Sequence, residues 1–184
     1  MTTPHIIWLF LHLISLVIGF GAVIVIDTAG LLWLTTRVSL EFVIKVATIT
    51  QKLIWLGWVG LVISGLGLVQ YRTGSDNLFI IKMFAVTLLG LNGVFLYSIH
   101  KKFEQLHGTE VPARLQFKIG LASFISQVSW WTAIIIGFLH HEVAVYFSWP
   151  HNPYTIIISG TLGVLILLIA SEFIRPKSGV SIKK

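Results

Sequence analysis

The sequence predicts an all-α protein, a polytopic transmembrane helical bundle with five spans. Of the 184 residues, 55% are hydrophobic and only 11% are charged. Soluble domains carry about 25% charged residues, so this chain has too few to cover a surface that faces water. The apolar residues form five long runs, and at about 1.5 Å per residue each run can cross a hydrocarbon core about 30 Å thick. We therefore expect a single transmembrane domain, residues 1–184, surrounded by a lipid bilayer.

The first span is expected at about residues 6–34. Its stretch from Ile6 to Ile26 carries no Asp, Glu, Lys or Arg, yet it contains His12, and Asp27 follows directly. The residues before it include no Lys or Arg, and no small-residue cleavage site stands out. We therefore expect a retained helix rather than a removed signal peptide. Two ionisable side chains in one apolar helix need partners elsewhere in the chain.

The other four spans are expected at about residues 42–71, 78–100, 116–140 and 154–173. In front of the second span, the stretch from Leu40 to Lys52 has apolar residues on one face and charged residues on the opposite one. This pattern predicts a helical extension that lies at or beyond the membrane interface.

Each span has one face on which small or polar residues recur at helical spacing, about 100° per residue. Lipid offers polar groups no hydrogen-bond partner, so these faces are expected to line the bundle interior. The second span's face consists of small residues, which let helix backbones approach closely. In span order, the faces comprise His12, Ser15, Gly19, Ala22 and Gly30; Gly57, Gly60, Ser64 and Gly67; Lys82, Ala85, Leu89, Gly93 and His100; Gly120, Ser123, Gln127, Trp130, Gly137 and His141; and Thr155, Ser159 and Gly163.

The positions of Lys and Arg predict the orientation in the membrane. Eleven of the 13 fall on one side of the expected bilayer, and only Arg72 and Lys82 fall on the other. Cytoplasmic segments carry the excess of Lys and Arg, so we expect the N-terminus outside and the C-terminus in the cytoplasm of a cell membrane, of the prokaryotic cytoplasmic type. The eleven are Arg37, Lys45, Lys52, Lys101, Lys102, Arg114, Lys118, Arg175, Lys177, Lys183 and Lys184.

Charge and composition also exclude several classes of function. The formal net charge is +6, but the basic residues lie at the ends of apolar runs and form no patch mixed with exposed aromatic residues, so no nucleic-acid partner is expected. The chain has no cysteine, which excludes disulfides, thiolate metal sites and c-type haem attachment. A membrane-protein partner or a second copy of the chain remains a candidate partner.

The candidate chemistry lies near the outer ends of the spans, where His12, Lys82 and His141 occur at similar depth. Histidines that face one another on neighbouring helices hold a b-type haem, because each supplies one axial nitrogen. Nearby glycines would make room for the macrocycle. Two alternatives for His12 are a neutral ring bonded to a carbonyl or hydroxyl group of another helix, and a proton relay. The alternative for Lys82 is an ammonium group that reaches the headgroups on its flexible stem.

Two more outer histidines, His140 and His151, accompany His141 near the end of the fourth span. They could bind a metal beside Glu142, or they could be solvated loop residues. We favour the solvated residues and predict no metal site.

Asp27 and Lys52 form a predicted structural pair. Asp27 lies near the cytoplasmic end of its span, and Lys52 lies at the inner boundary of the next one. An ion pair between them would fix the register of the two helices. A carboxylate on a proton path is the alternative, but the chain forms no acidic series. Asn92 and Gln127 are expected to form hydrogen bonds between helices.

Two stretches carry a resemblance to known membrane proteins. They are His12-Leu-Ile-Ser-Leu-Val-Ile-Gly-Phe-Gly-Ala-Val and Phe79-Ile-Ile-Lys-Met-Phe-Ala-Val-Thr-Leu-Leu-Gly-Leu-Asn-Gly93. Over about residues 6–100 the chain resembles the CopD-type copper-resistance membrane proteins and, more distantly, the HemJ-type protoporphyrinogen oxidases. In the HemJ type, a first-helix histidine and a lysine at the start of the third helix are implicated in haem ligation. The resemblance implies these roles for His12 and Lys82.

The sequence thus favours a haem-binding membrane protein, with His12 as one axial ligand of haem b and Lys82 or His141 as the other. Such a protein would act in electron transfer or porphyrin chemistry. Two alternatives stay open: a non-enzymatic accessory or structural membrane subunit, whose buried polar residues only join helices, and a metal-handling membrane protein. No catalytic residue is predicted, and the sequence leaves open whether the protein is an enzyme.

Overall fold

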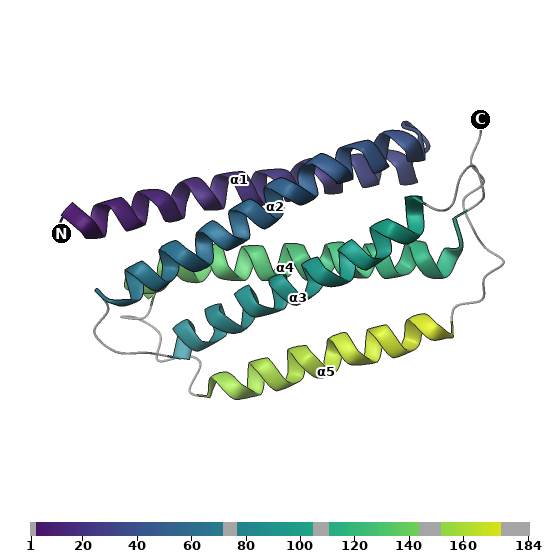
Figure 1. Cartoon of the computed structure of the whole chain (residues 1–184). Helices are drawn as coiled ribbons and strands as arrows, with labels where there is room; N and C mark the ends of the chain where they lie inside the picture. The colour runs from purple at the N-terminus through teal and green to yellow at the C-terminus, as the bar shows by residue number, and fades with distance from the viewer. Residues whose placement is uncertain (1–2, 72–76, 105–110, 144–151, 174–184) are drawn as a thin grey trace. The chain divides into compact units, whose positions relative to one another are not determined.

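The computed structural model describes residues 3–71, 77–104, 111–143 and 152–173, and these form an all-helical structure (Figure 1). The described helices are α1 (Thr3–Leu34), α2 (Leu40–Val69), α3 (Asn77–Glu104), α4 (Ala113–Val143) and α5 (Pro153–Glu172). Within the described residues, all five helices are long and apolar enough to cross a membrane. The predicted all-α class is therefore confirmed, and each of the five predicted spans corresponds to a helix that could cross a membrane.

The chain divides into two compact units, Met1–Gly74 and Ser75–Lys184. The first contains α1 and α2, and the second contains α3, α4 and α5. Each unit is described by itself below, and the single transmembrane domain stays a prediction.

A short turn makes α1 and α2 antiparallel neighbours. At the end of α1, the amide of Thr36 donates to the Trp33 carbonyl (2.9 Å) and the amide of Arg37 donates to the Leu32 carbonyl (2.8 Å). This is the Schellman pattern, and it places Thr36 in the left-handed region, with φ at 60°. Ser39 then caps α2, because its hydroxyl oxygen accepts a hydrogen bond from the Phe42 amide at 3.2 Å.

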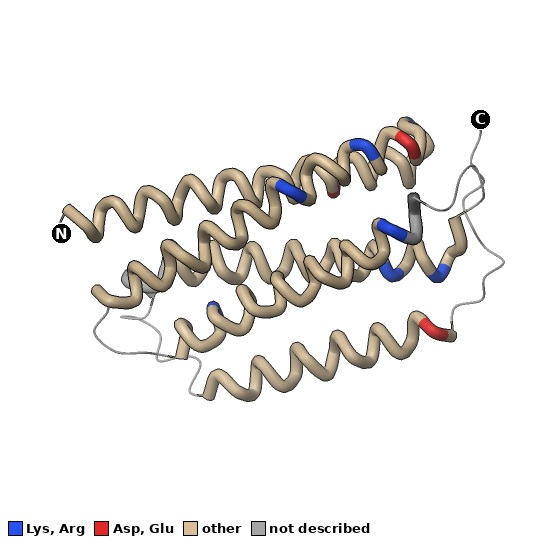
Figure 2. Tube along the Cα trace, in the orientation of Figure 1, with Lys and Arg blue, Asp and Glu red and all other residues tan. Residues whose placement is uncertain are grey.

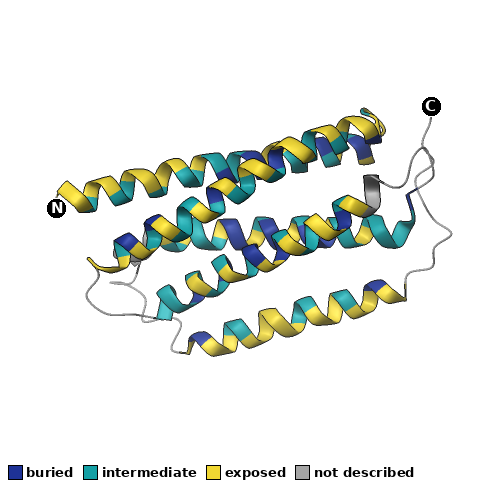
Figure 3. Cartoon of the chain, in the orientation of Figure 1, coloured by how far each residue is buried: buried dark blue, intermediate teal, exposed yellow. Residues whose placement is uncertain are grey.

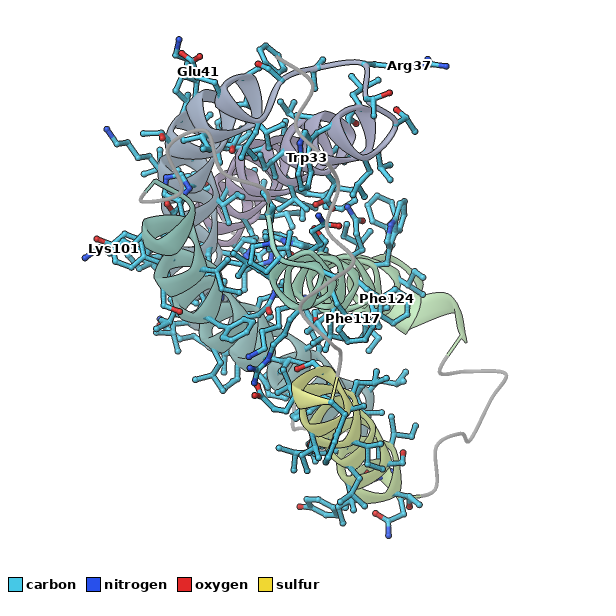
Figure 4. All side chains as sticks on the ribbon, turned by 90° about the vertical axis from the view of Figure 1, so that its right-hand side faces the viewer. Trp33, Arg37, Glu41, Lys101, Phe117 and Phe124 are labelled. Carbon is cyan, nitrogen blue, oxygen red and sulfur yellow. The ribbon has the colours of Figure 1, made fainter. Side chains whose placement is uncertain are left out.

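The helical extension predicted before the second span is present. Helix α2 is continuous from Leu40, so the stretch to Lys52 belongs to the same helix as the span. At the turn, Trp33 is buried, whereas Arg37 and Glu41 project away from the helices (Figure 4).

In the second unit, α3 and α4 run antiparallel and share a buried face. Asn92 of α3 donates its side-chain N–H to the Ala122 carbonyl of α4 at 2.8 Å, which confirms the hydrogen bond between helices predicted for Asn92. The residues of the two helices that are buried most include Ile81, Ala85, Leu89, Leu121, Ala122, Ile125, Ser126, Ser129 and Trp130 (Figure 3).

The face predicted for the fourth span is partly wrong. Trp130 is almost fully buried as expected, but Gly120 and Gly137 are exposed, and the fully buried positions include Ala122 and Ser129 instead. Ser123 and Gln127 are half-buried at the edge of the face. The buried face of α4 thus contains both small and large side chains, and part of the predicted face lies outside it.

Helix α5 contacts both α3 and α4. Asn152 caps its start by accepting a hydrogen bond from the Tyr154 amide at 3.0 Å. At the other end, the Glu172 carboxylate pairs with Arg114 and with Lys118, the latter at 2.6 Å, so α5 runs antiparallel to α4. Thr155 and Ser159 are exposed, so the prediction that they face the bundle interior is wrong for the described part of the chain.

Charged residues gather at one end of each unit (Figure 2). In the first unit they lie in the half of the hairpin near the α1–α2 turn. In the second unit they lie where α3 and α5 end and α4 begins, and Lys101 projects from that end of α3 (Figure 4). Among the residues whose side chains the structure describes, Lys82 lies away from this end of the second unit, near the start of α3.

Candidate site around His12

His12 lies on the face of α1 that contacts α2. Its side chain is half-buried, and its ring nitrogen Nδ1 is 2.9 Å from the hydroxyl oxygen of Ser64 on α2. Ser64 itself is 1% exposed. One alternative that the sequence allows for His12 is a ring bonded to a hydroxyl group of another helix. The contact with Ser64 is such a bond.

Ser64 has a second hydrogen-bond partner on its own helix. Its hydroxyl group donates to the Gly60 carbonyl, one helical turn away, at 2.5 Å. In a neutral imidazole one ring nitrogen donates and the other accepts, so the direction of the bond between Ser64 and His12 depends on the tautomer of the ring.

The helix contact around His12 is built from small residues. A Cβ atom added to Gly57 would overlap the backbone of Gly19, and one added to Gly60 would overlap the Ser15 hydroxyl group. One added to Gly67 would overlap the ring of Trp8. These glycines let the two backbones approach closely, as the sequence predicts for this face.

Four pairs form this contact, which we call the α1–α2 seam: Trp8 with Gly67, His12 with Ser64, Ser15 with Gly60, and Gly19 with Gly57. On both helices the positions are three or four residues apart, which keeps them on one side of each helix. His12 is the ionisable member of these four pairs, and its Cε1 atom would be 3.6 Å from a Cβ on Gly65. The seam therefore holds the imidazole ring against the backbone of α2.

The seam also limits where a macrocycle could lie. At Gly57, Gly60 and Gly67 the side chains and backbone of α1 occupy the space beside the glycines. A haem that binds His12 would have to lie outside the seam.

Lys82 is placed differently from His12. It belongs to the second unit, is half-buried, and its Nζ atom is 3.3 Å from the position that a Cβ on Gly137 of α4 would take. Its ammonium group therefore lies against α4. A side chain at Gly137 would press on that group, so the glycine leaves room for it.

The third predicted haem ligand, His141, and the two other outer histidines are only partly described. His140 and His141 lie on the last turn of α4, but their side chains are outside the described residues, and His151 is outside them altogether. Since His12 belongs to the first unit and Lys82 and His141 to the second, the shared site stays a prediction. Among the described residues, no group of three His, Cys, Asp or Glu side chains could hold a metal ion.

The ion pair between Asp27 and Lys52 also stays a prediction. Asp27 is half-buried on α1, and Lys52 is exposed on α2.

Sequence reasoning identified Ser64 as a packing residue but missed its hydrogen bond to His12. The signal was present, because Ser64 is the hydroxyl-bearing member of a face that otherwise consists of glycines. The turn length that brings Ser64 opposite His12 could not be read from the pattern.

Protein-family models, curated proteins and solved structures give no match to this chain. The fold defines the class instead: five long apolar helices indicate a multi-pass membrane protein.

Proposed function

We propose that this multi-pass membrane protein binds b-type haem, with His12 as one axial ligand and Lys82 or His141 as the other. The observation that carries the proposal is the burial and hydrogen bonding of His12. It is a half-buried imidazole in an apolar span, and its Nδ1 is engaged by Ser64. The resemblance to HemJ-type proteins supports the same residue independently.

The donor set fits the cofactor. A histidine that ligates a metal usually donates its other N–H to a second group, which fixes the ring and raises its basicity. Ser64 is placed to be this second group for His12, because its hydroxyl oxygen lies 2.9 Å from Nδ1. Haem, when bound, supplies a one-electron couple that suits electron transfer or porphyrin chemistry. Within the chain, His12 would hold the iron, and the seam would keep its ring in place.

The orientation belongs to the proposal as well. We place the N-terminus outside and the C-terminus in the cytoplasm, in a prokaryotic cytoplasmic membrane, because eleven of the 13 Lys and Arg residues fall on the expected cytoplasmic side. His12 and Lys82 then lie in the outer half of the membrane. Cysteines introduced at positions 102 and 151 should be labelled from opposite sides, and labelling from the same side would refute the topology.

One observation favours a second candidate function. The bonds from His12 to Ser64 and from Asn92 to Ala122 each join two helices. Such bonds can account for both polar side chains in an accessory or structural membrane subunit that binds no cofactor.

An absorption spectrum separates the two candidates. Wild-type protein, expressed with a haem supply and purified in detergent, is expected to show a Soret band. His12→Ala should lose the band while eluting as a folded protein. His5→Ala is the matched control, because it removes another histidine of α1 two turns away, and it should keep the band. A wild-type protein that stays colourless after haem reconstitution refutes haem binding and leaves the accessory subunit.

A further inference from the structure

We propose that Ser64 is a positioning residue for His12: through its bond to the Gly60 carbonyl, it holds the His12 proton on Nδ1 and presents Nε2 as the ligating nitrogen. The role toward haem rests on the proposed function. The tautomer of His12 does not, because it is a property of the chain alone.

The proposal follows from the two contacts of the Ser64 hydroxyl group with the Gly60 carbonyl and the His12 ring. The Ser64 oxygen is 2.5 Å from the Gly60 carbonyl oxygen and 2.9 Å from Nδ1 of His12. If Nδ1 were the acceptor, the Ser64 proton would point to the ring, and two oxygen atoms would face each other at 2.5 Å without a proton between them. That contact is repulsive. The proton therefore lies between Ser64 and Gly60, and His12 donates.

The surroundings of Ser64 keep its hydroxyl group bonded to the Gly60 carbonyl. Its side chain is 1% exposed, so water does not compete for the hydroxyl group. Gly60 belongs to the same helix, so its carbonyl is held by the α2 backbone. Two contacts flank His12 along the seam: Trp8 with Gly67, and Ser15 with Gly60. They hold α1 against α2 on both sides of His12.

Two consequences for ligand binding follow. The ring is oriented before any ligand arrives, which lowers the conformational cost of binding. The Nδ1–H bond also raises the electron density at Nε2, and outer groups of this kind typically contribute about 10- to 100-fold to metal affinity. Ser64→Ala should therefore weaken haem binding by roughly 10- to 100-fold. A stronger imidazole donor favours the ferric state, so the same change should raise the reduction potential of bound haem.

Ser15→Ala is the matched control. Ser15 lies in the same seam, one turn from His12, and its hydroxyl donates to the Leu11 carbonyl of its own helix at 2.8 Å. Removing it takes one hydroxyl group from the seam without touching the bond to His12. Ser64→Thr is the conservative variant, because it keeps the hydroxyl group.

The test is nitrogen-15 NMR of the haem-free protein, labelled at the histidine rings, at a pH where imidazole is neutral. The His12 signals are assigned by their loss in His12→Gln. We expect Nδ1 to be protonated in wild type, Ser15→Ala and Ser64→Thr, and the proton to redistribute toward Nε2 in Ser64→Ala. The wild-type spectrum needs no variant to fold, and a proton on Nε2 there would overturn the inference.

A haem titration of the same proteins separates this inference from the proposed function. Haem affinity in Ser64→Ala equal to that of wild type overturns the role of Ser64 toward haem and leaves haem binding intact. A chain with the Nδ1–H tautomer that binds no haem refutes the proposed function and leaves Ser64 as the residue that sets the tautomer.

Discussion

The α1–α2 hairpin and helix α5 are both built from helices apolar enough to cross a membrane, but they are held in different ways. In the seam, glycines bring two backbones into contact, and a buried hydroxyl group joins them to His12. Helix α5 instead exposes most of its apolar side chains and is joined to α4 by a partly exposed carboxylate at one end. Lipid is as apolar as these side chains, so hydrophobicity alone does not bring helices together in a membrane. Close packing and polar contacts do, and they are concentrated where the candidate site lies.

The largest loss of stability is expected when a seam glycine is replaced, because these glycines allow the close contact of α1 with α2. Gly57→Ala should destabilise the α1–α2 hairpin by roughly 2–3 kcal/mol, because the added methyl group meets backbone that cannot move aside. Gly160→Ala on α5 is the matched control, since a Cβ there has nothing within 4 Å. Unfolding in a denaturing detergent series measures both, and equal stability of the two variants would refute the contrast.

The second effect concerns the bond between α3 and α4. Asn92→Ala removes the hydrogen bond to the Ala122 carbonyl and should cost about 1 kcal/mol, the usual size of such bonds between membrane helices. Leu91→Ala, at a neighbouring position that is 64% exposed, should leave the contact between the helices intact. The same denaturing series compares them. A larger loss in Leu91→Ala would show that the bond contributes little.

The third effect tests the turn that sets the register of the seam. Thr36 has a φ of 60°, a conformation that costs a β-branched residue roughly 1–2 kcal/mol. Thr36→Gly should therefore stabilise the hairpin by about 1 kcal/mol. Thr35→Gly should destabilise it, because glycine loses more backbone entropy on folding and lacks the hydroxyl group that Thr35 donates to the Leu31 carbonyl at 3.0 Å. Opposite signs are expected in thermal unfolding, and the same sign in both would contradict the assigned turn.

The smallest effect is expected at the end of α5. Glu172→Gln should cost about 1 kcal/mol or less in global stability, because the ion pairs of Glu172 with Arg114 and Lys118 are partly exposed to solvent and their charges are screened there. The change should instead be local. Hydrogen exchange should quicken in the last turns of α5 and stay unchanged in the seam. Faster exchange throughout the chain would show that α5 is more firmly integrated than its contacts indicate.

The sequence predicted the helices well and their contacts unevenly. Run length and the absence of charge determine a span, so all five helices were found. The seam face of α2 was predicted because Gly57, Gly60, Ser64 and Gly67 repeat at helical spacing and have little use other than close packing. On α4 the same reasoning selected Gly120, which is exposed, whereas the buried contact face includes Ala122, Ser129 and Trp130.

The candidate site was predicted in part. His12 stood out because an ionisable group in an apolar helix requires an explanation. Its partner Ser64 could not be assigned, because the register of α1 against α2 depends on the backbone of the turn at Thr36, which no periodicity reports. The position of Lys82 against Gly137 depends in the same way on the register of α3 and α4.

The central claim is that His12 is a haem ligand, and a haem titration of the haem-free protein in detergent tests it most directly. Soret absorbance is followed for wild type, His12→Ala and His5→Ala in parallel. We expect wild type and His5→Ala to saturate at a single haem per chain, and His12→Ala to show only the absorbance of free haem. Saturation of His12→Ala at the wild-type level, or no saturation in any of the three, would contradict the claim.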